Sequence, residues 1–232
     1  MDDVLERLAI HEYDPVFVEG VLKHVRNVAG DTVRPDVRTI GYHGTSLETV
    51  KTLLRTGNLP GSFLEYPDPH LPKKGDIYFA PLAGKIPPGV TPRHVFQTPQ
   101  ESFDEAEVYA NLNSRDVRVL RQLGLDPYDP RYAIWGEEIL SPSKGLRNLK
   151  TAPPPINELT EEQVEAVYVA DEQYKGFVLG LDESIVKDRT VSVGESGDDL
   201  RISTMGGLPL DAITEIYPLG AEEENFIESL RK

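Results

Sequence analysis

Residues 37–57 read VRTIGYHGTSLETVKTLLRTG, and the fold prediction starts from this stretch. Its first part, Val37–Tyr42, has the composition of a short strand that ends at His43. Ser46 is a good N-cap for a following helix. The apolar residues after it have the spacing of one helical face: Leu47, Val50, Leu53 and Leu54. Gly57 then closes this helix, so the stretch predicts a strand, a tight turn and a helix.

The segments on either side predict helices and long loops. Residues 1–30 read as helical, with Pro15 at the permitted first position of a second segment. Residues 58–75 and 81–100 are rich in proline and glycine, and long loops in a compact domain are usually functional. Between these two loops, Ile77–Ala80 predicts a second short strand.

A third helix is predicted to begin at Ser102. Glu105, three residues later, completes a capping-box pattern with it. After this helix, residues 122–160 are irregular and proline-rich, and they predict a loop-rich insertion.

The last third of the chain is strand-like. Its predicted strands are Val164–Ala170, Phe177–Leu181, Thr190–Val193, Leu200–Thr204 and Ile213–Pro218. The first two flank a turn at Lys175 and Gly176, which predicts a hairpin. The next two flank the turn 194–198 and predict another, and residues 221–231 predict a terminal helix.

These elements predict an α+β fold with mostly antiparallel short strands. No sharp change of composition marks a domain boundary, so we expect residues 1–232 to form a single domain. Residues 1–36 are expected to be an N-terminal helical cap. Residues 37–220 are then the core, with the insertion at about 122–160.

Composition limits the functional classes. The chain has 232 residues, a formal net charge of −15 and no cysteine, which excludes disulfides, thiol nucleophiles and zinc–thiolate sites. No stretch approaches the roughly 20 apolar residues of a membrane helix. The first residues, MDDVLERLAI, lack the basic start and apolar run of a signal peptide. We therefore expect a cytoplasmic protein without membrane contact.

The acidic charge and the histidines bear on partners and metals. A nonspecific nucleic-acid binder normally needs a basic surface, so protein or small-molecule partners are favoured over nucleic acid. The five histidines are scattered and form no His-x-x-x-His pair. We therefore expect no metal site.

His43 is the first candidate for chemistry. It lies at the predicted strand end, before a glycine and two hydroxyl residues that open a helix. A side chain there projects from a rigid edge, and Gly44 lets a ligand approach the backbone. A turn with a solvated imidazole would explain the same residues.

Two tyrosines are further candidates. Tyr78 and Phe79 are neighbours in a predicted strand, where side chains alternate between faces. Phe79 is therefore expected in the core and Tyr78 on the opposite face. Tyr109 lies on the third predicted helix, where helix packing alone would also explain it.

Three segments together resemble the ADP-ribosyltransferase superfamily, in its PARP-like and diphtheria-toxin-like branch with a His–Tyr–Glu triad. They are Tyr42-His43-Gly44-Thr45-Ser46, Gly75-Asp76-Ile77-Tyr78-Phe79-Ala80 and Glu105-Ala106-x-x-Tyr109-Ala110. The landmarks run from about Tyr42 to the last predicted strand. The resemblance implies a split antiparallel β-sheet core flanked by helices, with the N-terminal helices as an extension.

The resemblance also implies a binding site for NAD. In it, His43 binds the 2′-hydroxyl of the adenine-side ribose, and the Gly44 backbone holds the nicotinamide carboxamide. Tyr78 and Tyr109 sandwich the nicotinamide ring. Thr45 and Phe79 complete the cofactor-binding set. His43 and Tyr109 are also counted among the catalytic residues.

The catalytic acid implied by the resemblance is Asp199, with Glu195 as the runner-up. The family places a glutamate at the start of this late strand, whereas the aligned residue here is the shorter aspartate. The family's frequent serine three residues before the second tyrosine is replaced by Ala106.

The implied activity is transfer of ADP-ribose from NAD to an unidentified target, with release of nicotinamide and no metal. Cleavage of this bond passes through an oxocarbenium-like state that a nearby carboxylate stabilises. Three alternatives stay open: a non-catalytic module that binds NAD or ADP-ribose, an RNA 2′-phosphotransferase, and a structural or interaction protein.

Overall fold

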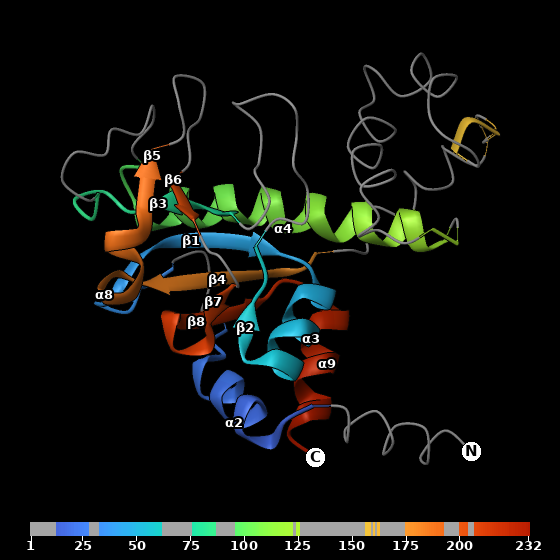
Figure 1. Ribbon diagram of the computed structural model, residues 1–232, viewed down its shortest axis with the longest axis horizontal. Helices are drawn as coiled ribbons and strands as arrows, with labels where there is room; N and C mark the ends of the chain where they lie inside the picture. Colours follow the sequence, from blue (N-terminus) through green and yellow to red (C-terminus); the bar gives the residue numbers. More distant parts are fainter. Residues whose placement is uncertain are drawn as a thin grey trace.

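The computed structural model describes residues 13–27, 33–61, 76–86, 96–122, 124–125, 156–158, 160, 162, 175–192, 200–203 and 207–232. Within these ranges the chain combines an antiparallel sheet with helices on both of its faces (Figure 1). The predicted α+β class is therefore confirmed. The division into an N-terminal cap, a core and an insertion stays a prediction.

The main sheet has six strands. In the order in which they lie side by side, they are β5 (Thr190–Ser192), β6 (Leu200–Ser203), β3 (Asp76–Pro81), β1 (Thr39–Thr45), β4 (Phe177–Asp182) and β8 (Ile213–Pro218). Each neighbouring pair is antiparallel. A separate antiparallel pair is formed by β2 (Asn58–Leu59) and β7 (Leu208–Pro209).

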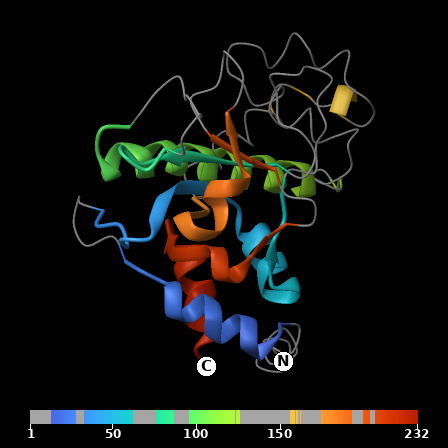
Figure 2. The same ribbon diagram turned by 60° about the vertical axis from the view of Figure 1, so that its left-hand side comes forward.

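The long helices cover the two faces of this sheet. One face carries α4 (Pro99–Gln122), and the other carries α2 (Pro15–His24), α3 (Leu47–Thr56) and α9 (Ala221–Leu230) (Figures 1 and 2). Shorter helical segments are α8 (Glu183–Val186) and the 3₁₀ turns η2 (Ile156–Glu158), η4 (Lys187–Arg189) and η5 (Leu210–Ala212).

Each face buries its own apolar cluster. The larger one joins the sheet to α2, α3 and α9, through residues such as Val21, Leu53, Phe79, Leu179 and Ile227. The smaller one lies under α4, and its members include Tyr42, Phe103, Ala106, Ala110 and Tyr217. Removal of this apolar surface from water is the main driving force for the layered arrangement.

The strand–helix unit at residues 37–57 agrees with its sequence pattern in most respects. The Ser46 side chain accepts a hydrogen bond from the Thr49 amide, and Gly57 ends α3 in the left-handed region, at φ 70°. The four predicted apolar positions of α3 are its buried ones. The strand, however, does not end at His43. It continues to Thr45, because β4 pairs with it as far as Thr45 opposite Phe177.

The start of α4 also differs from its prediction. The helix begins at Pro99, and Thr98 and Glu101 form the capping box: Thr98 Oγ1 accepts from the Glu101 amide at 3.2 Å, and Glu101 Oε2 accepts from the Thr98 amide at 3.4 Å. Ser102 is therefore inside the helix. Its hydroxyl donates to the carbonyl of Ala80 on β3 at 2.8 Å instead of capping.

One of the two predicted hairpins is confirmed. β5 and β6 pair antiparallel, and residues 193–199 between them lie outside the described residues. The hairpin between 164–170 and β4 is wrong, because β1 and β8 occupy both edges of β4. The segment 164–170 itself lies outside the described residues.

The two ends of the described chain agree with their patterns. Pro15 begins α2 after the N-cap Asp14, although the helix ends at His24, before Gly30. The last strand and the terminal helix lie where they were predicted. Residues 1–12 and most of 123–160 lie outside the described residues.

Helix α4 packs directly on β1 at Gly44. A Cβ atom added at Gly44 would overlap the carbonyl oxygen of Ala106 and the amide nitrogen of Ala110. These atoms are helix backbone, so a small side-chain rotation cannot relieve the overlap. Glycine is therefore required here for close packing of the helix, which is a different reason from the ligand approach expected from the sequence.

We predict that Gly44→Ala lowers the free energy of unfolding by at least about 2 kcal/mol, since overpacking against backbone forces the helix to shift. Urea unfolding monitored by circular dichroism measures this. Gly20→Ala is the matched control, because its Cβ would meet only the outer atoms of the Leu210 side chain. We expect this control to change stability by less than about 1 kcal/mol, since alanine also favours the helix. Equal losses in the two variants would contradict the packing argument.

Candidate functional site

β3 lies between β1 and β6 and pairs with each over a different part of its length. Its last residues pair with β1, through Pro81 opposite Gly41 and Ala80 opposite Tyr42. Its first residues, Asp76–Phe79, pair with β6 on the other edge. The same register with β1 would place Gly44 opposite Tyr78, but the pairing of these two strands ends two residues earlier, at Tyr42 and Ala80. The pairing of β1 with β3 therefore ends before the last three residues of β1, and we call this place the split.

His43 lies at this split. Its Nδ1 atom is 2.6 Å from the backbone carbonyl oxygen of Tyr78 on β3. A carbonyl oxygen only accepts hydrogen bonds, so Nδ1 carries the proton and donates it. In the neutral ring, Nε2 then carries the lone pair and acts as an acceptor. The strand pairing and this bond together fix the position and tautomer of the imidazole.

The imidazole is uncharged at neutral pH. Burial lowers the pKa of His43 from 6.5 to about 4, and the hydrogen bond to the Tyr78 carbonyl opposes this only in part. Loss of hydration disfavours the imidazolium more than one carbonyl dipole stabilises it. The site thus presents a neutral acceptor rather than a cation.

Tyr109 is brought to the same region by α4. Ser102 bonds to Ala80 on β3, and Ala106 and Ala110 lie on Gly44, so the helix runs along β1 toward its end. Tyr109 follows Ser102 by seven residues, which places it on the same side of the helix and roughly 10 Å further along. It is 41% exposed. The structure therefore places α4, the helix that carries Tyr109, on β1 at Gly44, the residue after His43.

The remaining residues of the predicted cofactor set differ in exposure. Phe79 is 1% exposed and belongs to the larger core, whereas Tyr78 is half-buried. This agrees with the expectation that Phe79 faces the core. Thr45 is buried at the end of β1, opposite Phe177. Phe79 therefore packs in the core beneath β3 and is not exposed for direct contact with a ligand.

Both candidate acids, Asp199 and Glu195, lie outside the described residues. Leu200, which follows Asp199 in the sequence, is the first residue of β6 and pairs with Phe79. The part of β6 that the structure describes is therefore directly beside the strand that carries Tyr78.

Ser102 is a contributor that the sequence pattern misassigned. It joins α4 to β3 and so sets where Tyr109 lies relative to the split. The sequence contains a second capping box, Thr98-Pro99-x-Glu101, with proline at the first helical position. This pattern could have predicted the correct start of the helix and left Ser102 inside it.

Charged side chains gather at the opposite end of the central strands. Arg38 lies 3.3 Å from Asp182, and Lys85 lies 2.7 Å from Glu183. The Asp182 carboxylate also caps α8 through the Ser184 amide. These groups compensate one another, so they stabilise the start of β1 and the end of β4 and are not a second candidate site.

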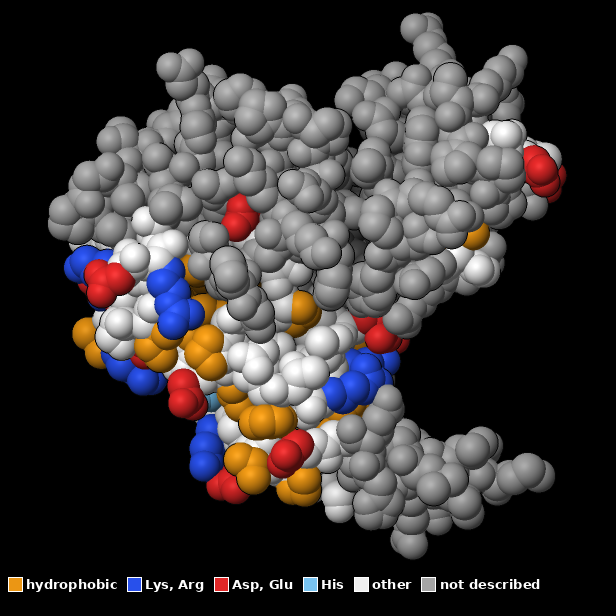
Figure 3. Space-filling model, in the orientation of Figure 1, with side chains coloured by type: hydrophobic (Ala, Val, Ile, Leu, Met, Phe, Trp, Pro, Cys, Tyr) orange, Lys and Arg blue, Asp and Glu red, His pale blue; other side chains and the backbone are white. Residues whose placement is uncertain are grey.

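Three further observations concern the other described residues. No group of three or more His, Asp or Glu among the described residues is arranged to hold a metal ion. On the face drawn in Figure 3, basic, acidic and hydrophobic side chains of the described residues are interspersed. No helix in the described ranges has both the length and the apolar character needed to cross a bilayer.

Comparison with known proteins adds no relative: no protein-family model, no curated protein and no solved structure matches this chain. The interpretation of the site therefore depends on its own residues.

We predict that one of the five histidines stays neutral until about pH 4. Histidine ring signals followed by NMR from pH 3 to pH 8 measure this, and their loss in His43→Gln assigns the residue. The tautomer is read from the ring nitrogen shifts. Titration of this ring near pH 6.5 would contradict the partly buried, carbonyl-bonded arrangement.

The same shift predicts how stability depends on pH. As pH falls from 6.5 to about 4, the unfolded chain takes up a proton at residue 43 and the folded chain does not. Folding stability is therefore lost over this interval, and it is fully present above it. Urea unfolding at pH 7 and pH 4.5 should show a smaller loss in His43→Gln than in the wild type. An equal loss in both would show that this histidine does not contribute.

Proposed function

We propose that this chain is an ADP-ribosyltransferase that binds NAD at the split between β1 and β3 and moves its ADP-ribose to an acceptor. The observation that carries the proposal is the neutral His43, held between the two strands by its hydrogen bond to the Tyr78 carbonyl. The proposal includes the PARP-like and diphtheria-toxin-like fold, and the early end of the pairing between β1 and β3 supports its split antiparallel sheet.

The acceptor nitrogen of His43 suits a ribose hydroxyl. A hydroxyl both donates and accepts hydrogen bonds, so it can donate to Nε2 while its own oxygen accepts elsewhere. A 2′-phosphate has only acceptor oxygens near neutral pH and would face the Nε2 lone pair unfavourably. This favours a ligand with a free ribose hydroxyl at this position.

The two tyrosines suit the nicotinamide ring. Tyr109 lies on α4, which packs on β1 at Gly44, and Tyr78 lies on the neighbouring strand β3. Offset stacking of flat rings adds about 0.5–1.5 kcal/mol beyond area burial. Tyr109 has the exposed surface that such a contact requires.

The proposed reaction breaks the bond between the ribose C1′ atom and the nicotinamide nitrogen. The bonding electron pair goes to that nitrogen, which neutralises the pyridinium, and positive charge develops on the ribose. An acceptor nucleophile then forms a bond to C1′ and loses its proton. A carboxylate near the ribose stabilises the developing charge more than the ground state, and we assign this role to Asp199, with Glu195 as the alternative.

The acceptor is proposed to be a protein or a small molecule. The net charge of −15 disfavours the polyanionic backbone of a nucleic acid. The shorter aspartate in place of glutamate supports one second candidate: a module that binds NAD or ADP-ribose without turning it over.

We predict different losses for the two key residues. His43→Ala should weaken NAD binding about tenfold or more, since one hydrogen bond and its buried surroundings are lost. Asp199→Asn should keep NAD binding and lower nicotinamide release at least about 100-fold, because the stabilising charge is removed. Titration calorimetry and a nicotinamide-release assay measure the two effects, with Glu195→Gln as the matched control.

The outcomes separate the candidates. Wild-type turnover in Asp199→Asn together with loss in Glu195→Gln would move the acid to Glu195. Binding without release in the wild type would identify the non-catalytic module. Absence of any binding heat with NAD would overturn the proposal. Incubation with labelled NAD in a lysate then identifies which fraction receives the ADP-ribose.

A further inference from the structure

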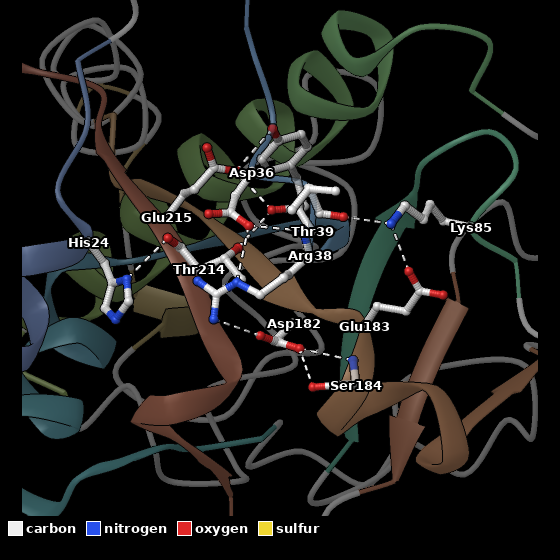
Figure 4. A network of polar contacts seen from close by, with 12 residues as sticks. His24, Asp36, Arg38, Thr39, Lys85, Asp182, Glu183, Ser184, Thr214 and Glu215 are labelled. Carbon is white, nitrogen blue, oxygen red and sulfur yellow. Dashed lines mark hydrogen bonds and ion pairs between the residues drawn. The ribbon is translucent and has the colours of Figure 1, made fainter.

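A buried carboxylate crosses from β8 toward β1. Glu215 is 3% exposed, and in the sheet it stands in one row with Gly180 of β4 and Tyr42 of β1. A Cβ atom at Gly180 would lie 3.0 Å from Glu215 Oε2 and 2.8 Å from Thr214 Oγ1. Gly180 therefore leaves room for the Glu215 carboxylate, which reaches Thr39 of β1 (Figure 4).

Hydroxyl groups from two strands surround this carboxylate. Oε2 accepts from Thr39 Oγ1 at 3.0 Å and from the Tyr42 hydroxyl at 3.4 Å, and Oε1 accepts from the Tyr217 hydroxyl at 2.9 Å. Burial, followed by the nearby Glu215 charge, raises the pKa of both tyrosines. Both phenols therefore keep their protons and act as donors.

The contacts of Glu215 lie where the strand pairing is irregular. The register of β1 on β4 shifts between Thr39 and Gly41, and that of β4 on β8 shifts between Gly180 and Leu181. Glu215 binds β1 on both sides of its irregularity, at Thr39 and at Tyr42. A slip of one residue would turn every following side chain of a strand to the other face. His43 is the next residue of β1, so its position depends on this register.

The same tyrosine connects the carboxylate to α4. The Tyr42 ring meets Phe103 of α4 edge-on, with centroids 5.5 Å apart, and Phe103 meets Tyr217 at 5.1 Å. Such edge-to-face pairs have defined geometry. Glu215 is thus connected through the Tyr42 ring to Phe103 of α4, the helix that also carries Tyr109.

We propose that Glu215 is a positioning residue, which sets the register of β1 and so holds His43 at the split. The importance of Glu215 for catalysis rests on the proposed function. Its role in holding β1 rests only on the contacts described above. A carboxylate suits the task because both of its oxygens accept, whereas the amide in Glu215→Gln would turn a donor toward one of the hydroxyls. Burial of the Glu215 carboxylate is costly in free energy. We infer that the carboxylate is kept because it specifies one register of β1.

The test follows His43 rather than stability alone. In Glu215→Gln the NMR pKa of His43 should rise from about 4 by at least one unit toward its ordinary 6.5, because the ring loses its buried, bonded position. Thr39→Val removes one donor to Glu215 and should shift the pKa in the same direction by less. Thr190→Val is the matched control, since its buried hydroxyl bonds only locally, to the Val186 carbonyl at 2.8 Å.

A merely structural role would lower the melting temperature of all three variants and leave the pKa of His43 in the folded protein unchanged. That result in Glu215→Gln would overturn the proposal. If Glu215→Gln does not fold, the pKa of His43 is compared between Thr39→Val and Thr190→Val. An unchanged pKa in Thr39→Val would then overturn the proposal. NAD affinity is measured in parallel: a shifted pKa in a protein that never binds NAD would support the positioning role and reject the proposed function.

Discussion

The close seating of α4 on β1 is the constraint from which most of the site geometry follows. Because Gly44 has no side chain, the backbone of Ala106 and Ala110 can lie directly on the strand. This seating brings Ser102 within hydrogen-bond distance of Ala80 on β3. The helix therefore holds β1 and β3 in a fixed relation at the place where their pairing ends.

Two polar groups, the partly buried His43 and the buried Glu215, make that relation specific. His43 satisfies its one donor with a backbone carbonyl, and Glu215 satisfies its acceptors with hydroxyls from β1 and from its own strand. In a medium of low polarity such groups are costly when unpaired, so each favours the single arrangement that satisfies it. One group remains neutral and able to recognise a hydroxyl. Glu215 is proposed to keep β1 in register.

Local sequence signals account for the elements that were predicted well and for one that was not. The cap at Ser46 and the glycine at 57 bound α3 because capping acts within a single helical turn. The start of α4 was misplaced because Ser102 and Thr98 both head a capping pattern, and the serine hydroxyl is used by β3 instead. The predicted hairpin at β4 was wrong for a non-local reason, because β1 and β8, which are distant in the sequence, pair with the two edges of β4.

The amino acids alone were enough to indicate an α+β chain and most of its helices and strands, because periodicity and turn chemistry act between near neighbours. They also named His43, Tyr78 and Tyr109 as candidate site residues. The folded arrangement was needed to show that His43 lies within β1, bonded to Tyr78, and that Glu215 reaches Tyr42 from 173 positions away. Strand pairing between remote segments depends on competition among all possible edges and on close packing of the whole core. No local pattern encodes the outcome of that competition.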